Sequence, residues 1–238
     1  MDLTTSSTQA SLMNAYYRAW SVRRVATAPL RGVMQSTTNV LWIGSYFELA
    51  KPWADASWVL LDLDADMLML GRQVLSGLPA VLGDIRHLPF FERFDTVVAL
   101  GAVTAYLLDD ISVECAAQAL RSTLVRRPTA RLLIDAYDSD TIHATNYFNG
   151  RGEWFHAHTR CTHTVETQHL SKSNGVFLTT LTIAEDRGSE IHSHRFQFRQ
   201  RAFTGSDLAG AFEKQGLRLL DAYTDPGQGR LYQTYALV

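Results

Sequence analysis

Two acids and a glycine lie at turns that follow short apolar runs of this chain, namely Gly44, Asp62 and Asp84. Asp62 follows Gly44 by 18 residues (62 − 44), close to the spacing at which an acid after a second parallel strand holds ribose hydroxyls. A carboxylate suits that task because it accepts from two adjacent hydroxyls at once. A glycine at the first turn lets backbone approach a ligand. These residues predict a nucleoside-binding edge.

Local structure offers another explanation for each of these residues. Gly44 could serve an ordinary tight turn. Either Asp62 or Asp64 could cap the helix that follows, and we assign Asp62 to the ribose and Asp64 to the cap. Asp84 could accept from an adenine amine while its apolar neighbour Ile85 packs on the ring, or it could form an Asx turn.

A fourth turn, Leu100–Leu107, is rich in small residues and carries Tyr106. It also follows an apolar run, so we expect it at the same edge as the other turns. Its small side chains leave room for a ligand. Tyr106 could carry its hydroxyl into the cleft or pack beneath it.

Apolar runs that alternate with helix-like stretches must position these turns. The helix-like stretches Ala65–Leu75 and Ile111–Val125 separate runs that are typical of buried parallel strands. Right-handed crossovers then favour a doubly wound sheet, whose ligands bind beyond the carboxyl ends of its strands. The five runs are Val40–Ile43, Trp58–Leu61, Ala80–Leu82, Thr96–Leu100 and Arg131–Ile134.

Beyond residue 150 the pattern changes to that of antiparallel strands. Polar and apolar residues alternate with period 2 in Thr162–His169, Val176–Ala184 and Ile191–Arg201, and glycine-containing turns separate these segments. A capping sequence that begins at Thr204 predicts a further helix. The last residues predict a hairpin around a Pro-Gly turn.

These patterns predict an α/β protein with three parts. Residues 1–36 form an N-terminal helical segment. Residues 37–150 and 202–238 form the core, a doubly wound, mostly parallel seven-stranded sheet with helices on both faces. Residues 151–201 form a small antiparallel β insert after the fifth strand.

The composition excludes several classes of protein. The chain has 238 residues, 46% of them hydrophobic and 19% charged, with a formal net charge of −2, so it can bury a core and is not expected to be disordered. It has no basic excess for a nucleic-acid backbone and no apolar run of membrane-spanning length. Its two cysteines make no disulfide framework, and its first residues lack a signal-peptide pattern. We therefore expect a soluble, cytoplasmic protein.

Four segments match motifs of one enzyme family. Val59–Leu68 is similar to its second motif, and Gly83–Phe90 is similar to its adenine-contacting segment. Phe94–Val98 resembles its fourth motif, and Arg201–Thr204 resembles the entry to its last helix. Together these segments resemble class I S-adenosylmethionine-dependent methyltransferases of the small-molecule type, and the antiparallel insert resembles that of amino-sugar and glycine N-methyltransferases.

The resemblance implies S-adenosylmethionine as the cofactor and methyl transfer to nitrogen or oxygen. It departs at the first motif, where Trp42 replaces an acid, and Tyr46 and Glu48 replace two glycines. Those glycines let the backbone lie against the methionine part of the cofactor, so Tyr46 and Glu48 would crowd it unless their side chains turn away. The implied cofactor-binding residues are Gly44, Ser45, Tyr46, Asp62, Leu63, Asp84, Ile85 and Leu100.

Methyl transfer requires a positioned acceptor and, where the nucleophile carries a proton, a base. The catalytic candidates are Tyr106, His156 and His158, with His143 and Tyr147 as further bases or orienters. A tyrosine of ordinary pKa, about 10, is a poor base at neutral pH. Tyr106 would therefore orient the nucleophile by hydrogen bonding.

Aromatic residues could wall the acceptor. The segment Tyr147–His158 follows the fifth strand and could fold over the cleft as a lid. Trp154 and Phe155 in this segment could equally pack between the insert and the core. The expected substrate-contacting residues are Tyr16, Trp20, Tyr147, Trp154 and Phe155.

Two pairs of histidines stand two residues apart, His156 with His158 and His192 with His194. On a strand each pair would share a face and could offer two nitrogens to a metal. No carboxylate stands at a recognisable ligand spacing from them. We therefore expect no metal site.

Three functions stay open at this point. The first is S-adenosylmethionine-dependent methyl transfer to a small molecule. The second is another reaction on the same fold, such as a cyclisation or an isomerisation, and the third is a non-catalytic binding subunit. The altered first motif motivates the second. The terminal hairpin and the insert are both candidate contacts for a homodimer.

Overall fold

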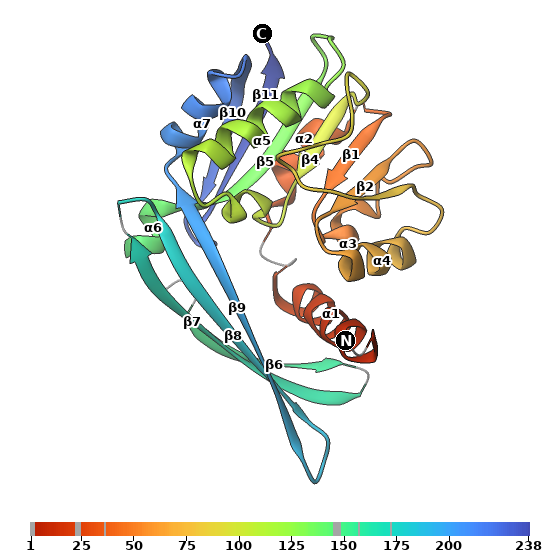
Figure 1. The fold of residues 1–238 in the computed structure, drawn as a ribbon, viewed down its shortest axis with the longest axis vertical. Helices are drawn as coiled ribbons and strands as arrows, with labels where there is room; N and C mark the ends of the chain where they lie inside the picture. Colours follow the sequence, from red (N-terminus) through yellow and green to blue (C-terminus); the bar gives the residue numbers. More distant parts are fainter. Residues whose placement is uncertain (1–2, 22–24, 36, 145–148, 157, 172) are drawn as a thin grey trace.

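The computed structural model describes residues 3–21, 25–35, 37–144, 149–156, 158–171 and 173–238. The N-terminal segment is helical, as predicted: α1 (Leu3–Tyr16), the π-helical turn η1 (Tyr17–Ser21) and α2 (Thr27–Met34). Figure 1 shows α1 below the α/β body, where it contacts α4 (Ala65–Val74) and β6 (Gly150–His156). Within the described ranges, no helix is both long and apolar enough to cross a membrane.

Five parallel strands form the centre of the body in the order β3-β2-β1-β4-β5. All five lie where the apolar runs predicted them. The central strands β1, β2 and β4 are buried along their whole length, which explains their continuous apolar sequence. The strand order reverses between β1 and β4. The bounds are β1 (Val40–Ile43), β2 (Val59–Asp62), β3 (Ala80–Leu82), β4 (Thr96–Ala99) and β5 (Arg131–Asp138).

Helices cover both faces of these strands. Alternate residues of β1 belong to different cores: Leu41 and Ile43 join the core that includes residues of α5 and α7, whereas Val40 and Trp42 join the core that includes residues of α2, α3 and α4. This confirms the expected α/β layering. The remaining helices are α3 (Phe47–Ala50), η3 (Val103–Tyr106), α5 (Asp110–Thr123), α6 (Ser139–Ala144) and α7 (Gly205–Glu213).

The two predicted helix caps are confirmed. The Asp64 side chain accepts from the backbone N–H groups of Asp66 and Met67 at the start of α4. The Thr204 hydroxyl accepts from the N–H of Asp207 at the start of α7. Each cap satisfies donors that the first turn of a helix leaves unpaired.

The C-terminal hairpin was also predicted. It consists of β10 (Leu217–Asp225) and β11 (Arg230–Leu237), and β11 pairs antiparallel with β5. It therefore extends the parallel sheet on the far side of β5 from β4.

The antiparallel insert is larger than the sequence suggested. It has four strands, β6, β7 (Thr159–Ser171), β8 (Val176–Asp186) and β9 (Ile191–Phe203), where three were expected. The end of β9 continues in parallel pairing beside the end of β5, through Ala202 with Tyr137. The expectation of a seven-stranded sheet with a separate insert is therefore corrected: the described strands form one mixed sheet of 11.

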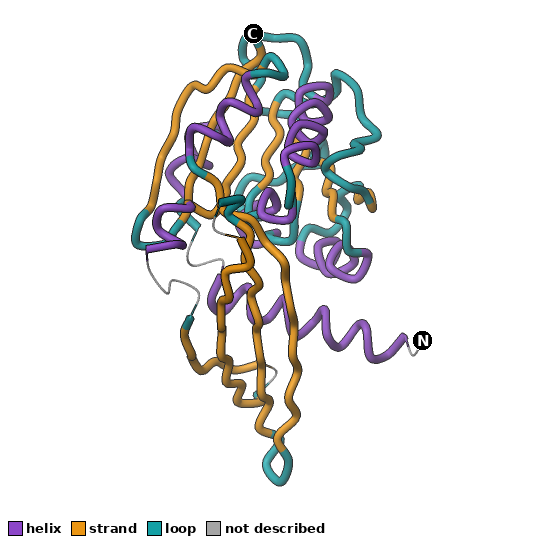
Figure 2. Tube along the Cα trace, turned by 60° about the vertical axis from the view of Figure 1, so that its left-hand side comes forward, coloured by secondary structure: helices purple, strands orange, loops and turns teal. Residues whose placement is uncertain are grey.

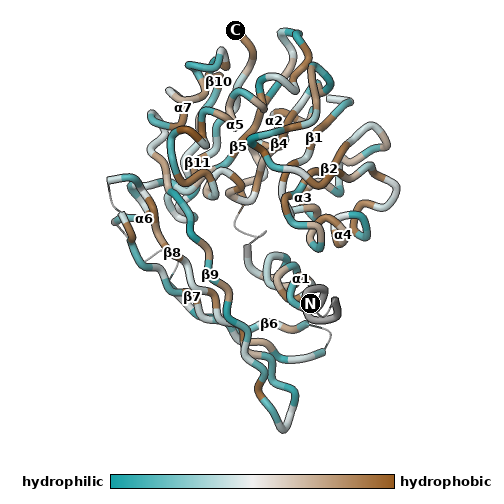
Figure 3. Tube along the Cα trace, viewed as in Figure 1, coloured by the Kyte–Doolittle hydropathy of each residue, from teal (hydrophilic) through white to brown (hydrophobic). Residues whose placement is uncertain are grey.

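The long strands β7 to β9 leave the body and curve past α1 (Figures 1 and 2). Figure 3 shows hydrophobic residues concentrated along the central strands and alternating with hydrophilic ones along β8 and β9. That alternation gives the antiparallel strands one apolar face and one polar face. The apolar face points back toward α1 and the body, since α1 shares a core with Trp154, Leu181 and Ile183.

Candidate functional site

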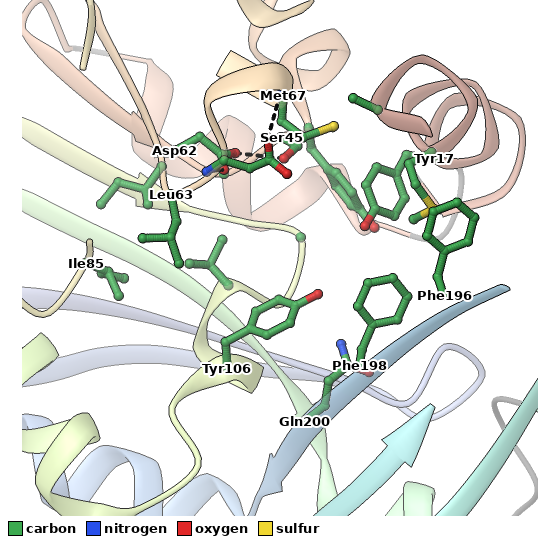
Figure 4. A pocket seen from close by; sticks show the side chains of 18 of the residues that line it. Tyr17, Ser45, Asp62, Leu63, Met67, Ile85, Tyr106, Phe196, Phe198 and Gln200 are labelled. Atoms are coloured by element: carbon green, nitrogen blue, oxygen red, sulfur yellow. Dashed lines mark hydrogen bonds between the residues drawn. The ribbon is translucent and has the colours of Figure 1, made fainter. Parts of the chain in front are cut away.

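A cavity of about 560 Å³ lies between the carboxyl ends of β1 to β4 and the inner face of β7 to β9. Tyr16 and Tyr17, at the junction of α1 and η1, line a third side. The volume falls within the range of about 300–1,000 Å³ that is usual for small-molecule sites. Figure 4 shows side chains from these elements around the cavity.

The residues that follow β1, β2 and β3 form one side, which we call the strand-end wall. Asp62 lies at its centre. The Ser45 hydroxyl donates to Asp62 Oδ2 at 2.7 Å, and the backbone N–H of Asp64 donates to Oδ1 at 2.9 Å (Figure 4). The wall consists of Ser45, Asp62, Leu63, Asp84 and Ile85, and all five line the cavity.

Asp62 is a carboxylate with little solvent around it. Only 8% of its surface is exposed, and desolvation raises its pKa above the usual value, although the hydrogen bonds from Asp64 and Ser45 act in the opposite direction. The carboxylate oxygens have further lone pairs beyond the two bonds shown. Two adjacent ribose hydroxyls would supply the donors that such a group requires.

The backbone conformation and the close packing at Gly44 both require a glycine at this position. Its φ of +95° is one that other residues adopt only with strain. A Cβ at this position would lie 2.5 Å from Cγ2 of Val103 and 3.0 Å from the carbonyl oxygen of Leu100. The glycine therefore lets the turn after β1 approach the turn after β4 across the switch point.

Glu48 is turned away from the cavity, whereas Tyr46 stays on its lining, so only one of the two side chains meets the condition for a cofactor to fit. The Tyr46 ring packs over Gly101, where a Cβ would lie only 3.2 Å from ring atoms. Tyr46 is 5% exposed, and its ring centroid is 5.7 Å from that of Tyr17. Glu48 forms an ion pair with Arg18 at 3.2 Å and is not among the cavity-lining residues. Tyr46 still forms part of the lining beside Gly44.

Asp84 forms the proposed Asx turn, and its contact with adenine stays a prediction. Its Oδ1 accepts from the backbone N–H of Arg86 at 2.8 Å, which is the Asx turn, and its carboxylate also binds the Arg86 guanidinium. Hydrogen bonding by Arg86 holds the pKa of Asp84 below its usual value. Ile85 is buried and Leu63 is largely exposed, and both lie on the lining, so an apolar slot adjoins two carboxylates.

The antiparallel strands form the opposite side, which we call the sheet wall. Its residues lie on one face because they pair across strands: Val165 with Leu181, Leu181 with Phe196, and Thr179 with Phe198. Along β9 the lining residues recur at every second position. The wall consists of Val165, Thr179, Leu181, Phe196, Phe198 and Gln200.

Tyr106 lies where the two walls meet, and Figure 4 shows its ring reaching into the cavity beside Gln200. About half of its surface, 49%, is exposed, and it lines the cavity. Desolvation raises the pKa of Tyr106 to about 12, against a smaller lowering by hydrogen bonding with Gln200. The Thr179 hydroxyl donates to Gln200 Oε1 at 3.0 Å. At neutral pH Tyr106 is therefore a neutral, oriented hydroxyl.

A buried ion pair fixes the turn that carries Tyr106. Asp135 on β5 and Arg230 on β11 pair at the floor of the cavity, with side chains 0% and 4% exposed. Asp135 Oδ1 accepts from the N–H of Ala102 at 2.7 Å, and its carbonyl accepts from the Thr104 hydroxyl at 2.6 Å. Ala102 has a φ of +56°, so these bonds hold a strained backbone in place.

Seven expected site residues do not line the cavity, and one of them, His143, packs against His169 at 4.8 Å between ring centroids. Leu100 is fully buried in the core below it. Trp20 packs instead on His163, at 4.7 Å between ring centroids. The other four lie on or next to β6, which is the outer edge of the sheet: Trp154, Phe155, His156 and His158.

The geometry of β6 explains these positions. Trp154 is 6% exposed and packs in the core beneath α1, whereas Phe155 points to the other face and is 72% exposed. His156 is the last residue of β6, and His158 follows it in the turn with a φ of +71°. Tyr147 lies outside the described residues. Of the expected substrate residues, Tyr16 does line the cavity.

The sequence reasoning missed the sheet wall and the Asp135–Arg230 pair. Period-2 alternation at Phe196, Phe198 and Gln200 was a signal for one face of a strand, but it did not tell what that face covers. The ion pair joins residues 95 positions apart, and no local pattern marks it.

The histidines of one pair lie beside glutamates. His192 lies 3.2 Å from Glu190, and His194 lies 3.1 Å from Glu185. Among the residues that the structure describes, no group of three or more His, Cys, Asp or Glu side chains is arranged to hold a metal ion.

No protein-family model matches this sequence, and no curated protein matches it either. Solved structures do match the fold. DesVI of Streptomyces venezuelae gives a TM-score of 0.74 at 16% identity, covering 94% of this chain and 92% of that one. The sugar N-methyltransferase KedS8 of Streptoalloteichus gives 0.73 at 15% identity over 92% and 90%.

A third match is CalS10 of Micromonospora echinaspora, an amino pentose methyltransferase whose structure contains bound S-adenosylmethionine. Its TM-score is 0.69 at 17% identity, with coverage of 93% of this chain and 96% of that one. Likeness at this level of identity establishes a shared fold, which is the α/β fold of S-adenosylmethionine-dependent methyltransferases.

Proposed function

We propose that this chain transfers a methyl group from S-adenosylmethionine to a small-molecule acceptor. The observation that carries the proposal is Asp62, a poorly solvated carboxylate at the end of β2 that faces the cavity with acceptor capacity to spare. It stands where a doubly wound sheet binds the ribose of a nucleoside. The fold that this chain shares with methyltransferases of solved structure supports the same proposed function.

The strand-end wall contains residues suited to the ribose and the adenine of the cofactor. Asp62 would accept from the two ribose hydroxyls. Asp84 would accept from the adenine amine, while Leu63 and Ile85 would pack on the ring. The bound cofactor supplies a methyl group on a sulfonium centre, which is open to in-line attack by a nucleophile.

The chain's own contribution to the reaction is positioning. Methyl transfer gains most of its rate from holding the nucleophile in line with the methyl group. Tyr106, held beside Gln200, would orient the acceptor by a hydrogen bond at its nucleophilic atom. With its pKa raised to about 12, Tyr106 does not remove a proton at neutral pH. Nitrogen and oxygen acceptors both suit this arrangement.

Calorimetric titration with S-adenosylmethionine and S-adenosylhomocysteine tests the proposal. We expect saturable binding of both to the full chain. Asp62→Ala removes two hydrogen bonds to a charged group, each worth about 1.5–3 kcal/mol, so binding should weaken by about 100-fold or more. Asp109→Asn is the matched control, because asparagine keeps the helix cap at the start of α5 and Asp109 does not line the cavity. Its affinity should stay close to that of the unchanged chain.

Two outcomes would contradict the proposal. One is no binding of either compound at millimolar concentration. The other is an Asp62→Ala variant that binds as tightly as the unchanged chain.

A second function is favoured by Tyr46. Its side chain lies on the lining beside Gly44, at a position where the methyltransferase pattern has no side chain. A chain that binds the cofactor and catalyses another reaction would show tight S-adenosylhomocysteine binding without methylated product. Tyr46→Gly would then be expected to leave that outcome unchanged, whereas a methyltransferase limited by crowding would gain affinity.

A further inference from the structure

We propose that the acceptor is an amphipathic molecule, with a hydrophobic ring body and a polar nucleophilic group at one end. The sheet wall binds the body, and Tyr106 with Gln200 binds the polar end. This inference rests on the proposed function of the same cavity, because it names the class of acceptor that the cavity would take.

The polar and apolar residues of the sheet wall are separated along β9. Gln200 lies nearest the body, beside Tyr106, and Phe198 and Phe196 follow in the direction of the strand tip (Figure 4). Polar groups therefore gather at one end of the wall and aromatic rings at the other. An acceptor with the same division would place its nucleophile beside Tyr106.

The apolar part of the wall is continuous across three strands. Val165 on β7 pairs with Leu181 on β8, which pairs with Phe196 on β9, and Phe198 lies on the same face two residues away. Phe196 and Phe198 are partly buried against the core beneath α1. Figure 4 shows Tyr17 beside Phe196, and Tyr17 packs against the same core as this patch. A hydrophobic ring body of the acceptor would lie against this patch.

A polyhydroxylated acceptor fits this surface poorly. The four side chains of the apolar patch have no hydrogen-bonding group, and Thr179 and Gln200 already bond to each other at 3.0 Å. Burying a hydroxyl without a hydrogen-bond partner costs about 1–3 kcal/mol of binding free energy. Several ring hydroxyls facing the patch would therefore weaken binding, whereas an apolar ring face would strengthen it.

Two neutral probes that both carry a hydroxymethyl group test this inference: 2-naphthylmethanol and methyl β-D-glucopyranoside. Each is titrated calorimetrically into the full chain saturated with S-adenosylhomocysteine. We expect the naphthyl probe to bind at least about tenfold more tightly. Equal affinity, or tighter binding of the glucoside, would overturn the inference.

Variants on the two faces of β9 locate the binding surface. Phe198→Ala should weaken naphthyl binding by about tenfold, and Phe198→Leu, which keeps apolar surface and the fold, by less. Arg199→Ala is the matched control, since Arg199 is exposed on the other face of the same strand. Circular dichroism checks that each variant is folded. Equal naphthyl affinity of Phe198→Ala and the unchanged chain would also overturn the inference.

The same titration distinguishes failure of the inference from failure of the proposed function. If S-adenosylhomocysteine does not bind, the proposed function fails, and the probes are titrated into the chain alone. Preference for the naphthyl probe would then still support the hydrophobic acceptor site. If S-adenosylhomocysteine binds and the preference is absent, only the acceptor class is wrong.

Discussion

The strand-end wall and the sheet wall face the same cavity but are held by different kinds of contact. In the strand-end wall, Asp62 bonds to groups 2 and 17 residues away in the chain, and Asp84 bonds to a residue 2 away. In the sheet wall, Thr179 bonds to Gln200, 21 residues away. Gln200 in turn hydrogen bonds with Tyr106, which lies in a distant segment of the chain.

This difference matters for how each wall can change. Short-range bonds at strand ends fix a polar geometry suited to a constant ligand such as a nucleoside. Side chains on a strand face can be exchanged without altering the ladder that holds them, because alternate positions face opposite sides. The cavity therefore combines a polar edge held by local hydrogen bonds with a strand face whose substitution would alter acceptor choice.

The largest expected effect comes from the ion pair beneath the turn that lies between the walls. Asp135→Ala leaves the Arg230 charge buried without its partner, so the free energy of unfolding should fall by about 3–5 kcal/mol in urea titration. The double variant Asp135→Leu with Arg230→Met removes both charges and should recover part of this loss. If Asp135→Ala lowered the free energy of unfolding by less than about 1 kcal/mol, the ion pair would not be what fixes this turn.

Gly44→Ala should disturb the strand-end wall, because Gly44 directly precedes Ser45 in the turn after β1. It forces a Cβ into Val103 at 2.5 Å and imposes a φ of +95° on alanine, for an expected loss of about 1–3 kcal/mol in thermal or urea unfolding. Gly77→Ala is the control, because Gly77 has a φ of +88° with nothing within 4 Å of its Cβ position. If both variants lost the same stability, close packing at Gly44 would play no part.

The negative charge of Asp62 should destabilise the folded chain, although cofactor binding depends on this carboxylate. Desolvation raises its pKa in the folded chain, so the folded state binds its proton more tightly than the unfolded state does. Stability from this group is then lost as pH rises above the unfolded pKa of 3.8. Asp62→Asn should therefore be more stable than the unchanged chain at pH 7, and the difference should close as pH falls toward 3.8. A difference independent of pH, measured by thermal unfolding, would contradict this.

The smallest effect is expected at the outer edge of the strand-end wall. The Arg86–Asp84 pair is partly exposed, so Arg86→Ala should change stability by less than about 1 kcal/mol. The pKa of Asp84, measured by NMR, should rise toward its usual value because Arg86 lowers it. An unchanged pKa would show that the carboxylate does not depend on this neighbour.

Much of the fold could be predicted because it follows local rules. The five parallel strands, the caps at Asp64 and Thr204 and the terminal hairpin all lie where apolar runs and capping residues indicated. The added strand β6 and the junction of β9 with β5 were missed. They depend on pairing between residues such as Tyr137 and Ala202 that are far apart in the chain.

The candidate site divides in the same way. The strand-end positions Asp62, Asp84 and Ile85 could be named from turns after apolar runs, since the ends of parallel strands share one edge. The catalytic role expected of His156 and His158 stays a prediction, and neither residue lines the cavity. We expected the segment that contains them to fold over the cleft. Instead, β6 pairs with β7 and lies at the outer edge of the sheet.

By itself, the sequence determined which residues stand at the strand ends, because hydrophobic periodicity and capping act over a few positions. Only the tertiary structure decided what stands opposite them. The path of β9 beside β5 brings Phe196, Phe198 and Gln200 to face the strand-end wall. That path follows from sheet pairing and core packing between distant segments, which no short stretch of sequence encodes.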